Sequence, residues 1–422
     1  MAKHFSPVNW VLASTLISVT GEWILTLIVP WFVIASTGST SLAGLVLFAE
    51  LAPAVVVRFM AGPVVGRVGR RLTSWLTGVV QAVCVAMVAV LVAADALAFP
   101  VLLALMALMG AAGGAGVLAK GGLAPAAAKF VGLRQGFAIS MSGAMIAGGQ
   151  VVGPALGGPL VHIPVVGLVA VAVLFAVASL IIGRLPRGME SARVQVVHAK
   201  DKPGYWKSLG EQIHHFRKDR LLVKLFAMLF TMEFLVAPMN GVFLPQWARE
   251  TGAGAGTIAT LASSAAFAGL VGNFVAVYVT QRVRPYVLMS VGYALIVPQL
   301  LVLALGAPVW LVNVVWVVAG FAGAFPFAVV GQISQLRPPE EFRDQTRAVG
   351  GAITRSGSAL GAPVLGSAVQ YLGLTGTLLG AAAMYFAMTQ GTVHGKDIRA
   401  LEPGISREDL PGASTPEKER VG

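Results

Sequence analysis

Residues 165–183 read VVGLVAVAVLFAVASLIIG, a run that contains no charged residue. A helix of about 20 apolar residues, rising about 1.5 Å per residue, crosses the hydrocarbon core of a bilayer. This run therefore predicts a transmembrane helix. Across all 422 residues, 56% are hydrophobic and only 11% are charged, a surplus of apolar side chains that a globular core cannot bury. The composition predicts an integral membrane protein.

Eleven further apolar runs of similar length are separated by charged residues or turn residues, and each predicts one more transmembrane helix. The first six runs cover 11–36, 42–66, 74–94, 99–119, 136–161 and 165–183, and the second six cover 222–247, 256–280, 286–305, 309–330, 348–371 and 375–393. We therefore predict an all-α integral membrane fold, with twelve transmembrane helices in two pseudo-symmetric six-helix bundles.

A long polar segment divides the runs six and six, which predicts four parts of the chain. The parts are an N-terminal bundle over 1–183, a cytoplasmic linker over 184–221, a C-terminal bundle over 222–393 and a cytoplasmic tail over 394–422. Within the linker, 205–220 could form an amphipathic helix on the membrane surface. The tail is rich in charge and proline and is expected to be disordered.

The cations predict the orientation. Of the 30 Lys and Arg residues, only Arg58, Lys120, Arg249 and Arg355 lie outside the termini and alternate loops, so the other 26 (30 minus 4) share one side. By the positive-inside rule that side is the cytoplasm, which places both termini inside a bacterial cytoplasmic membrane. The net charge of +12 is explained by this topology, so no nucleic-acid partner is expected.

Landmark residues recur between the two halves at nearly constant offsets. The pairs are Gly153 and Gly361, Gly62 and Gly272, and Glu22 and Glu233, at offsets of 208, 210 and 211. Internal repetition of this kind is typical of transporter folds. It predicts that the two bundles superpose around a central cavity.

The fifth run contains a glycine-proline pattern, residues 149–158, GQVVGPALGG. It resembles the motif G-x-x-x-G-P-x-x-G-G in the fifth span of antiporters of the major facilitator superfamily. The residues that match are Gly149, Gly153, Pro154, Gly157 and Gly158. Glycines four residues apart let helices approach closely, and the proline permits bending. The plain alternative is helix packing without transport.

The turn after the second run, residues 62–71, reads GPVVGRVGRR. It resembles the superfamily signature G-x-L-A-D-R-x-G-R-R between the second and third spans. The matched glycines and arginines are Gly62, Arg67, Gly69, Arg70 and Arg71, whereas Gly66 stands in place of the aspartate. The charge lock that the aspartate normally makes is therefore missing, and the arginines could instead anchor to anionic lipid.

Residues 17–22, ISVTGE, the aromatic seventh run ending in PMN at 238–240, and the charged stretch 337–347 resemble the macrolide-efflux and drug-proton antiporter group. The resemblance implies proton antiport with alternating access that exports an amphipathic or hydrophobic drug, antibiotic or secondary metabolite. Those antiporters often carry an arginine in span four. This chain has small and apolar residues at 109–116, with Lys120 further toward the cytoplasm.

Ionisable groups inside apolar spans are costly and mark function, and three acids qualify: Glu22, Glu50 and Glu233. Glu22 and Glu233 fall near mid-membrane and are the leading proton-coupling candidates. The alternative is a permanently protonated acid hydrogen-bonded between helices. The basic residues Arg58, Lys120 and Arg355 are expected to extend toward the cytoplasmic surface, although Lys120 or Arg355 could instead pair with a carboxylate in one conformation.

Trp23, Phe234, Asn240 and Gln150 are the candidates for lining a substrate cavity, although contacts between helices explain them equally. No phosphate-binding loop, metal-ligand cluster or hydrolytic triad is recognisable in the sequence, so we expect no enzyme, metal or cofactor. The expected partners are a small-molecule substrate, protons and membrane lipids, for a monomer. Two alternatives remain open: export of a lipid-like or siderophore-like metabolite, and a membrane sensor or partner that does not transport.

Overall fold

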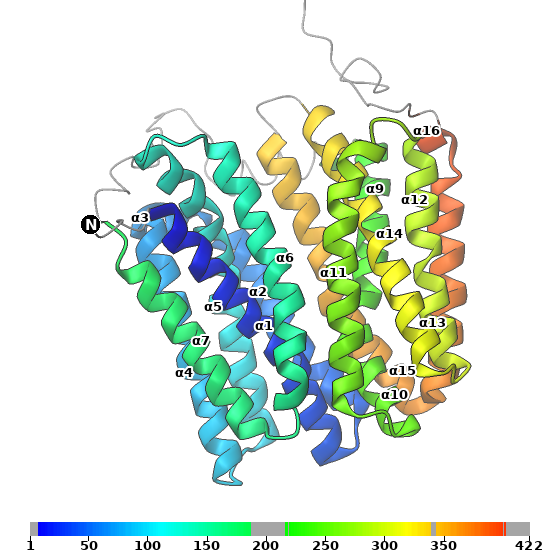
Figure 1. Ribbon diagram of the computed structural model, residues 1–422, viewed down its shortest axis with the longest axis horizontal. Helices are drawn as coiled ribbons and strands as arrows, with labels where there is room; N and C mark the ends of the chain where they lie inside the picture. The colour runs from blue at the N-terminus through cyan, green and yellow to red at the C-terminus, as the bar shows by residue number, and fades with distance from the viewer. Residues whose placement is uncertain (1–6, 187–215, 218, 339–342, 400, 402–422) are drawn as a thin grey trace, which may run out of the picture.

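The computed structural model describes residues 7–186, 216–217, 219–338, 343–399 and 401. In this part of the chain every regular element is a helix, and eleven helical stretches are long and apolar enough to cross a membrane. One of them, α15 (Arg343–Val393), is 51 residues long and is interrupted at Gly373, whose φ of 74° is not helical. Figure 1 shows α15 running down the bundle and back up. It therefore supplies two spans, and the prediction of twelve is confirmed.

The helices follow the predicted runs in order. The first half contains α1 (Pro7–Thr37), α2 (Thr40–Met60), α3 (Gly62–Val68), α4 (Arg70–Ala93), α5 (Phe99–Phe130), α6 (Gln135–Leu160) and α7 (Pro164–Gly183). The second half contains α9 (Arg220–Pro238), the π-helix η2 (Met239–Phe243), α10 (Leu244–Thr251), α11 (Ala255–Val279), α12 (Pro285–Ala294), α13 (Ile296–Ala304), α14 (Val309–Leu336), α15 and α16 (Lys396–Arg399). One span is formed jointly by α9, η2 and α10, and another by α12 and α13.

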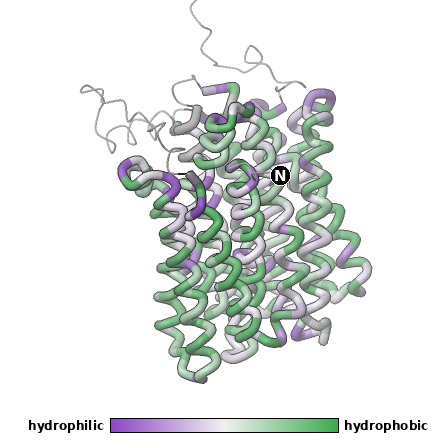
Figure 2. The backbone as a smooth tube through the Cα atoms, turned by 60° about the vertical axis from the view of Figure 1, so that its left-hand side comes forward, coloured by the Kyte–Doolittle hydropathy of each residue, from purple (hydrophilic) through white to green (hydrophobic). Residues whose placement is uncertain are grey.

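The bundle has two distinct ends. The start of α1 and the short helix α16 lie at the upper end in Figure 1, which we call the near end. The opposite or far end carries the turns at Gly38, Gly252 and Gly373, all three with positive φ. Figure 2 shows that most strongly hydrophilic segments gather toward the near end, whereas the middle of the bundle is mainly hydrophobic. An apolar middle band with a polar end is the expected profile of a membrane protein.

The glycine motifs hold equivalent helix pairs in the two halves. A Cβ atom added to Gly153 of α6 would lie 2.5 Å from the Cβ of Trp23 in α1. A Cβ atom added to Gly361 of α15 would lie 1.9 Å from the carbonyl oxygen of Phe234 in α9. Both glycines thus pack against the helix that carries the matching aromatic residue. The predicted repeat is confirmed at these positions.

Several boundaries differ from the sequence-based expectation. Helix α5 continues to Phe130 rather than ending near residue 119, because the glycines and alanines after 119 are compatible with helix. Helix α2 ends at Met60, and the turn that follows forms the separate helix α3. Most of the predicted linker, 187–215, and of the predicted tail, 402–422, lies outside the described residues. The first residues of that tail form the helical turn α16 instead, with Ile398 buried.

Candidate functional site

The two halves are joined by hydrogen bonds at the far end. The hydroxyl of Thr40, at the start of α2, donates to the carbonyl oxygen of Gly366 in α15 at 3.0 Å. The neighbouring hydroxyl oxygens of Ser41 and Ser367 are also 3.0 Å apart. These bonds link spans two and eleven across the seam between the halves, so this end of the bundle is closed.

A second contact at the far end joins α10 to α1. The guanidinium group of Arg249 donates to the carbonyl oxygen of Ile34, one of the last carbonyls of α1. The same carbonyl also accepts the backbone N–H of Gly38 at 2.9 Å, and a cation at a helix C-terminus is stabilised by the helix dipole. Arg249 therefore reinforces the closure between the first and seventh spans.

Glu22 lies beside a lysine of another helix. The ammonium group of Lys120 in α5 donates to the hydroxyl oxygen of Ser18 in α1 at 2.7 Å. Ser18 precedes Glu22 by one helical turn, and the charges of Lys120 and Glu22 interact. Both side chains are half-buried. The expectation that Lys120 extends to the surface is therefore wrong, because the length of α5 keeps it inside the helix and directed at α1.

Two arginines from different halves lie in the same region. The charge of Arg355, in α15, acts on Glu22 of α1, and the charges of Arg355 and Arg58 of α2 act on each other. Both arginine side chains are exposed. Within the described residues neither arginine has a hydrogen bond or an ion pair. Arg355 thus acts electrostatically on a residue of the first half without forming an ion pair among the described residues.

Glu50 joins this group through α2. Its side chain is half-buried and its charge acts on Glu22. The backbone at this point lies against α5, since a Cβ atom added to Gly110 would be 1.8 Å from the carbonyl oxygen of Glu50. The structure thus brings two of the three predicted acids together. We call the set of Glu22, Glu50, Arg58, Lys120 and Arg355 the central charge cluster.

The third predicted acid has a different environment. The hydroxyl of Ser358 in α15 donates to the carboxylate of Glu233 in α9. This bond joins two helices of the second half, where Gly357 and Gly361 bring the two backbones together. The described interactions connect Glu233 to Ser358 rather than to the central charge cluster.

Two of the four cavity candidates occupy equivalent positions in the two halves, and the other two have different surroundings. Trp23 and Phe234 are half-buried and occupy equivalent helix contacts, against Gly153 and Gly361 respectively. Asn240 lies in the π-helix η2 and donates from its amide to the carbonyl oxygen of Val236, 3.1 Å away in the same span. Such π-helical segments occur frequently at functional sites.

The remaining candidate, Gln150 of α6, is half-buried. It follows Gly149, at which a Cβ atom would lie 2.7 Å from a methyl carbon of Val19. Gln150 therefore lies in α6 next to the contact of this helix with α1, and α1 is the helix that carries Glu22.

The arginines after span two bind backbone carbonyls of neighbouring helices. Arg70 donates to the carbonyl oxygen of Gly122, inside α5, at 3.2 Å. Arg71 donates to the carbonyl oxygens of Ile182 and Gly183 at the end of α7, where carbonyls lack helical partners. These bonds within the first half differ from the lipid anchoring that the sequence left open.

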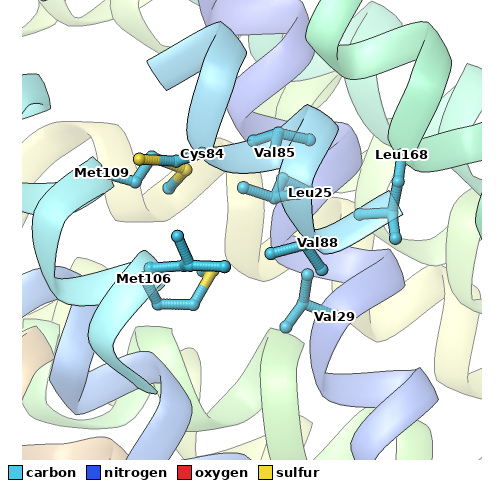
Figure 3. Close-up of a pocket in the computed structure, with 9 residues that line it drawn as sticks. Leu25, Val29, Cys84, Val85, Val88, Met106, Met109 and Leu168 are labelled. Carbon is cyan, nitrogen blue, oxygen red and sulfur yellow. The ribbon is translucent and has the colours of Figure 1, made fainter. Parts of the chain in front are cut away.

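The enclosed pockets do not coincide with the charge cluster. Figure 3 shows one narrow, apolar pocket inside the first half, lined by residues such as Leu25, Cys84 and Met106. Another pocket lies at the far end between α11 and α14, where Thr260, Trp310 and other residues line it. None of the predicted site residues lines either pocket. The central charge cluster remains the candidate site because it holds ionisable side chains of both halves, which these two pockets do not.

A twelve-span bundle of two similar halves, with ionisable groups directed between them, defines a membrane transporter of the alternating-access type. A model of the Major Facilitator Superfamily matches residues 11–243, more than half of the chain. The chain belongs to the major facilitator superfamily, and it is a multi-pass transporter rather than an enzyme. No curated protein matches the chain.

Solved transporter structures share the fold at low sequence identity. The nucleoside transporter NupG is 11% identical, with a TM-score of 0.74, over 92% of this chain and 98% of that one. A D-xylose-proton symporter is 12% identical, with a TM-score of 0.70, over 91% and 96%. A bacterial homologue of the human lysosomal transporter Spinster, inward-facing and unoccupied, is 15% identical, with a TM-score of 0.65, over 93% and 94%. At these identities the similarity establishes the fold alone.

Proposed function

We propose that this transporter is coupled to protons and that Glu22 is the coupling group. The observation that carries the proposal is that Glu22 interacts electrostatically with two cations, Lys120 of the same half, which binds Ser18 one turn away, and Arg355 of the other half. A charged carboxylate attracts both cations, whereas a protonated one attracts neither. Proton occupancy of Glu22 therefore changes the interaction between the halves, which is what alternating access requires.

The distribution of cations supports an orientation for this cycle. If the near end is cytoplasmic, as the positive-inside rule favours, the closure at Thr40, Ser41 and Arg249 lies on the outer side. The structure then corresponds to a state that is closed to the outside. Both termini lie in the cytoplasm, and the membrane is the bacterial cytoplasmic membrane.

Export by proton antiport is the first form of the proposal. Its support is the complete span-five motif at 149–158, which resembles that of the antiporters of this superfamily. A proton that moves down 100 to 150 mV provides about 2.3 to 3.5 kcal/mol, enough for a gradient of roughly fifty- to several-hundredfold. The exported compound is an amphipathic or hydrophobic small molecule, and in this form it competes with the proton.

Cotransport of a proton with an organic anion is the second form. The central charge cluster contains three cationic side chains: those of Lys120 and Arg355 act on Glu22, and that of Arg58 acts on Arg355. This concentration of charge does not favour the amphipathic or hydrophobic substrate that the family resemblance implies. In this form the anion binds best when Glu22 is protonated.

The test is flux in proteoliposomes, measured with a chemically diverse panel of neutral, cationic and anionic compounds, with and without a pH gradient. Wild type is compared with Glu22→Gln and with Glu250→Gln, a control acid at the far end. We expect gradient-driven flux to collapse for Glu22→Gln alone, while substrate binding survives. Flux that is indifferent to the pH gradient in all three proteins would refute proton coupling. Binding without any flux would favour the sensor alternative.

A further inference from the structure

We infer that Arg58 and Arg355 together bind the anionic group of the transported compound, a carboxylate or a phosphate. The inference rests on the proposed transport function, and it names the chemical class of the transported compound. It does not depend on whether Glu22 titrates, because the two arginines carry the binding.

The packing of α2 against α15 places the two arginines. These helices run antiparallel and touch at the far end, where Thr40 donates to Gly366 and Gly44 faces Ala362. Counted from the contact between Gly44 and Ala362, Arg355 is 7 residues away along α15 (362 minus 355) and Arg58 is 14 residues away along α2 (58 minus 44). These separations correspond to about 10 and 21 Å along the helix axes. Both arginines therefore lie toward the near end of the seam between the halves, staggered along it.

Arg355 lies within electrostatic range of the interior of the bundle. Its charge acts on Glu22, which belongs to α1, the span with the largest buried share. The side chain is nevertheless exposed, so the protein leaves space around it. Arg58, which is also exposed, interacts with the charge of Arg355, so the two guanidinium groups lie near each other.

The two guanidinium groups have unused binding capacity. Among the described residues, neither makes an ion pair or a hydrogen bond. Two like charges without a carboxylate partner repel each other, and charged groups within membrane spans are normally paired or functional. An anion between them would remove the repulsion and supply the missing partner. The planar fork of donors on arginine matches the oxygens of carboxylates and phosphates.

There is room for a ligand beside these side chains. Gly351 precedes Arg355 by one helical turn, and a Cβ atom added there would meet no atom within 4 Å. The same holds for Gly121, next to Lys120. The small residues thus leave open space on the same helical face as one arginine and beside the lysine.

Glu22 controls how strongly an anion is held. The charged residues on the elements around it are Glu50 and Arg58 of α2, Lys120 and Lys129 of α5, Arg249 and Glu250 of α10, and Arg355 of α15, which also carries Arg343, Asp344 and Arg347 near its start; α6, α7 and η2 carry none. A charged Glu22 competes with the ligand for Arg355. Neutral Glu22, as in Glu22→Gln, should therefore strengthen anion binding. This linkage favours the second form of the proposed function.

The experiment is a calorimetric titration of the full chain in nanodiscs of neutral lipid. The probes share one aromatic body: phenylpropionate and phenyl phosphate as anions, phenylpropylamine as the cation and phenylpropanol as the neutral compound. We expect at least one anion to bind more tightly than the amine and the alcohol. Arg355→Gln and Arg58→Gln should each weaken anion binding by about tenfold or more, the scale of a lost charged hydrogen bond.

Matched variants make the result specific. Arg355→Lys keeps the charge and serves as a control in case Arg355→Gln fails to fold. It should lose less affinity than Arg355→Gln does, because only the planar fork of donors is removed. Arg282→Gln, an exposed turn arginine, should leave binding unchanged. Glu22→Gln should bind the anion more tightly than wild type does.

Three outcomes would overturn the inference. They are no anion binding to wild type, equal binding of all four probes, and unchanged affinity in both Arg355→Gln and Arg58→Gln. A repeat in nanodiscs that contain phosphatidylglycerol separates the possible sources of the anion. If the probes no longer bind there, the arginines hold a lipid headgroup and the substrate assignment fails. Gradient-driven flux that survives in Glu22→Gln would refute the proton proposal alone and leave the anion site standing.

Discussion

Gly44 should decide how firmly the far end closes. It lies in α2 at the seam between the halves, and a Cβ atom added there would be 2.2 Å from the carbonyl oxygen of Ala362 and 2.9 Å from the carbonyl carbon. Both neighbours are backbone atoms, which cannot rotate away. Gly44→Ala therefore forces α2 and α15 apart at the far end and destabilises the state in which that end is closed.

The size of the effect follows from the cost of overpacking. One added methyl group in a close-packed contact costs about 1 to 3 kcal/mol. Only the closed state carries this cost, so the equilibrium should shift toward far-end opening by about 5- to 150-fold.

Disulfide formation measures the closed population. In a Cys84→Ser background, Ser41→Cys and Ser367→Cys replace hydroxyl groups whose oxygens are 3.0 Å apart, so oxidation should cross-link α2 to α15 when the far end is closed. Adding Gly44→Ala should slow this cross-linking.

The control is Gly110→Ala, where the Cβ would be 1.8 Å from the carbonyl oxygen of Glu50. That clash lies within the first half, so the variant should lose thermal stability and keep the parent cross-linking rate. If Gly44→Ala cross-links as fast as the parent, the close approach does not control the seam and the reasoning fails.

Three smaller predictions concern single contacts. Ser358→Ala removes the donor to Glu233 and should lower stability by about 1 kcal/mol in thermal unfolding, with transport retained; an unchanged midpoint would mean that the bond contributes nothing. Arg71→Ala removes the donor to the last carbonyls of α7 and should lower the unfolding temperature more than Arg67→Ala does. Lys224 holds the pKa of Asp397 below its ordinary value, so this pair stabilises the fold above the unfolded pKa of about 3.9 and ceases to do so as pH falls through the lower folded value. Asp397→Asn should therefore be less stable than wild type at pH 7 and equally stable near the acid limit, and a difference independent of pH would contradict the assignment.

The fold was predictable because each span carries its own signal. Apolar runs gave the helices, and the recurrence of Gly153 as Gly361 anticipated equivalent contacts in the two halves. The break at Gly373 was predicted as well, because the runs 348–371 and 375–393 end and begin on either side of this glycine, whose positive φ separates the two spans. Local pattern is sufficient for elements of this kind.

The site was only partly predictable, because the direction of a side chain depends on helices that are distant in sequence. Glu22 and Glu50 were recognised by their cost in an apolar span. Lys120 was assigned to the surface because α5 was expected to end near residue 119, whereas the longer helix directs this side chain at Ser18. Arg355 has no sequence feature that indicates its approach to a residue of the opposite half.

The most direct test of the account is the pH change that accompanies substrate binding to the purified protein in weakly buffered detergent solution. The account predicts a measurable exchange of protons for wild type and none for Glu22→Gln, with binding retained by both. Proton release would support antiport, and proton uptake would support cotransport with an anion. An equal pH change for wild type and Glu22→Gln would contradict the central claim that Glu22 couples transport to protons.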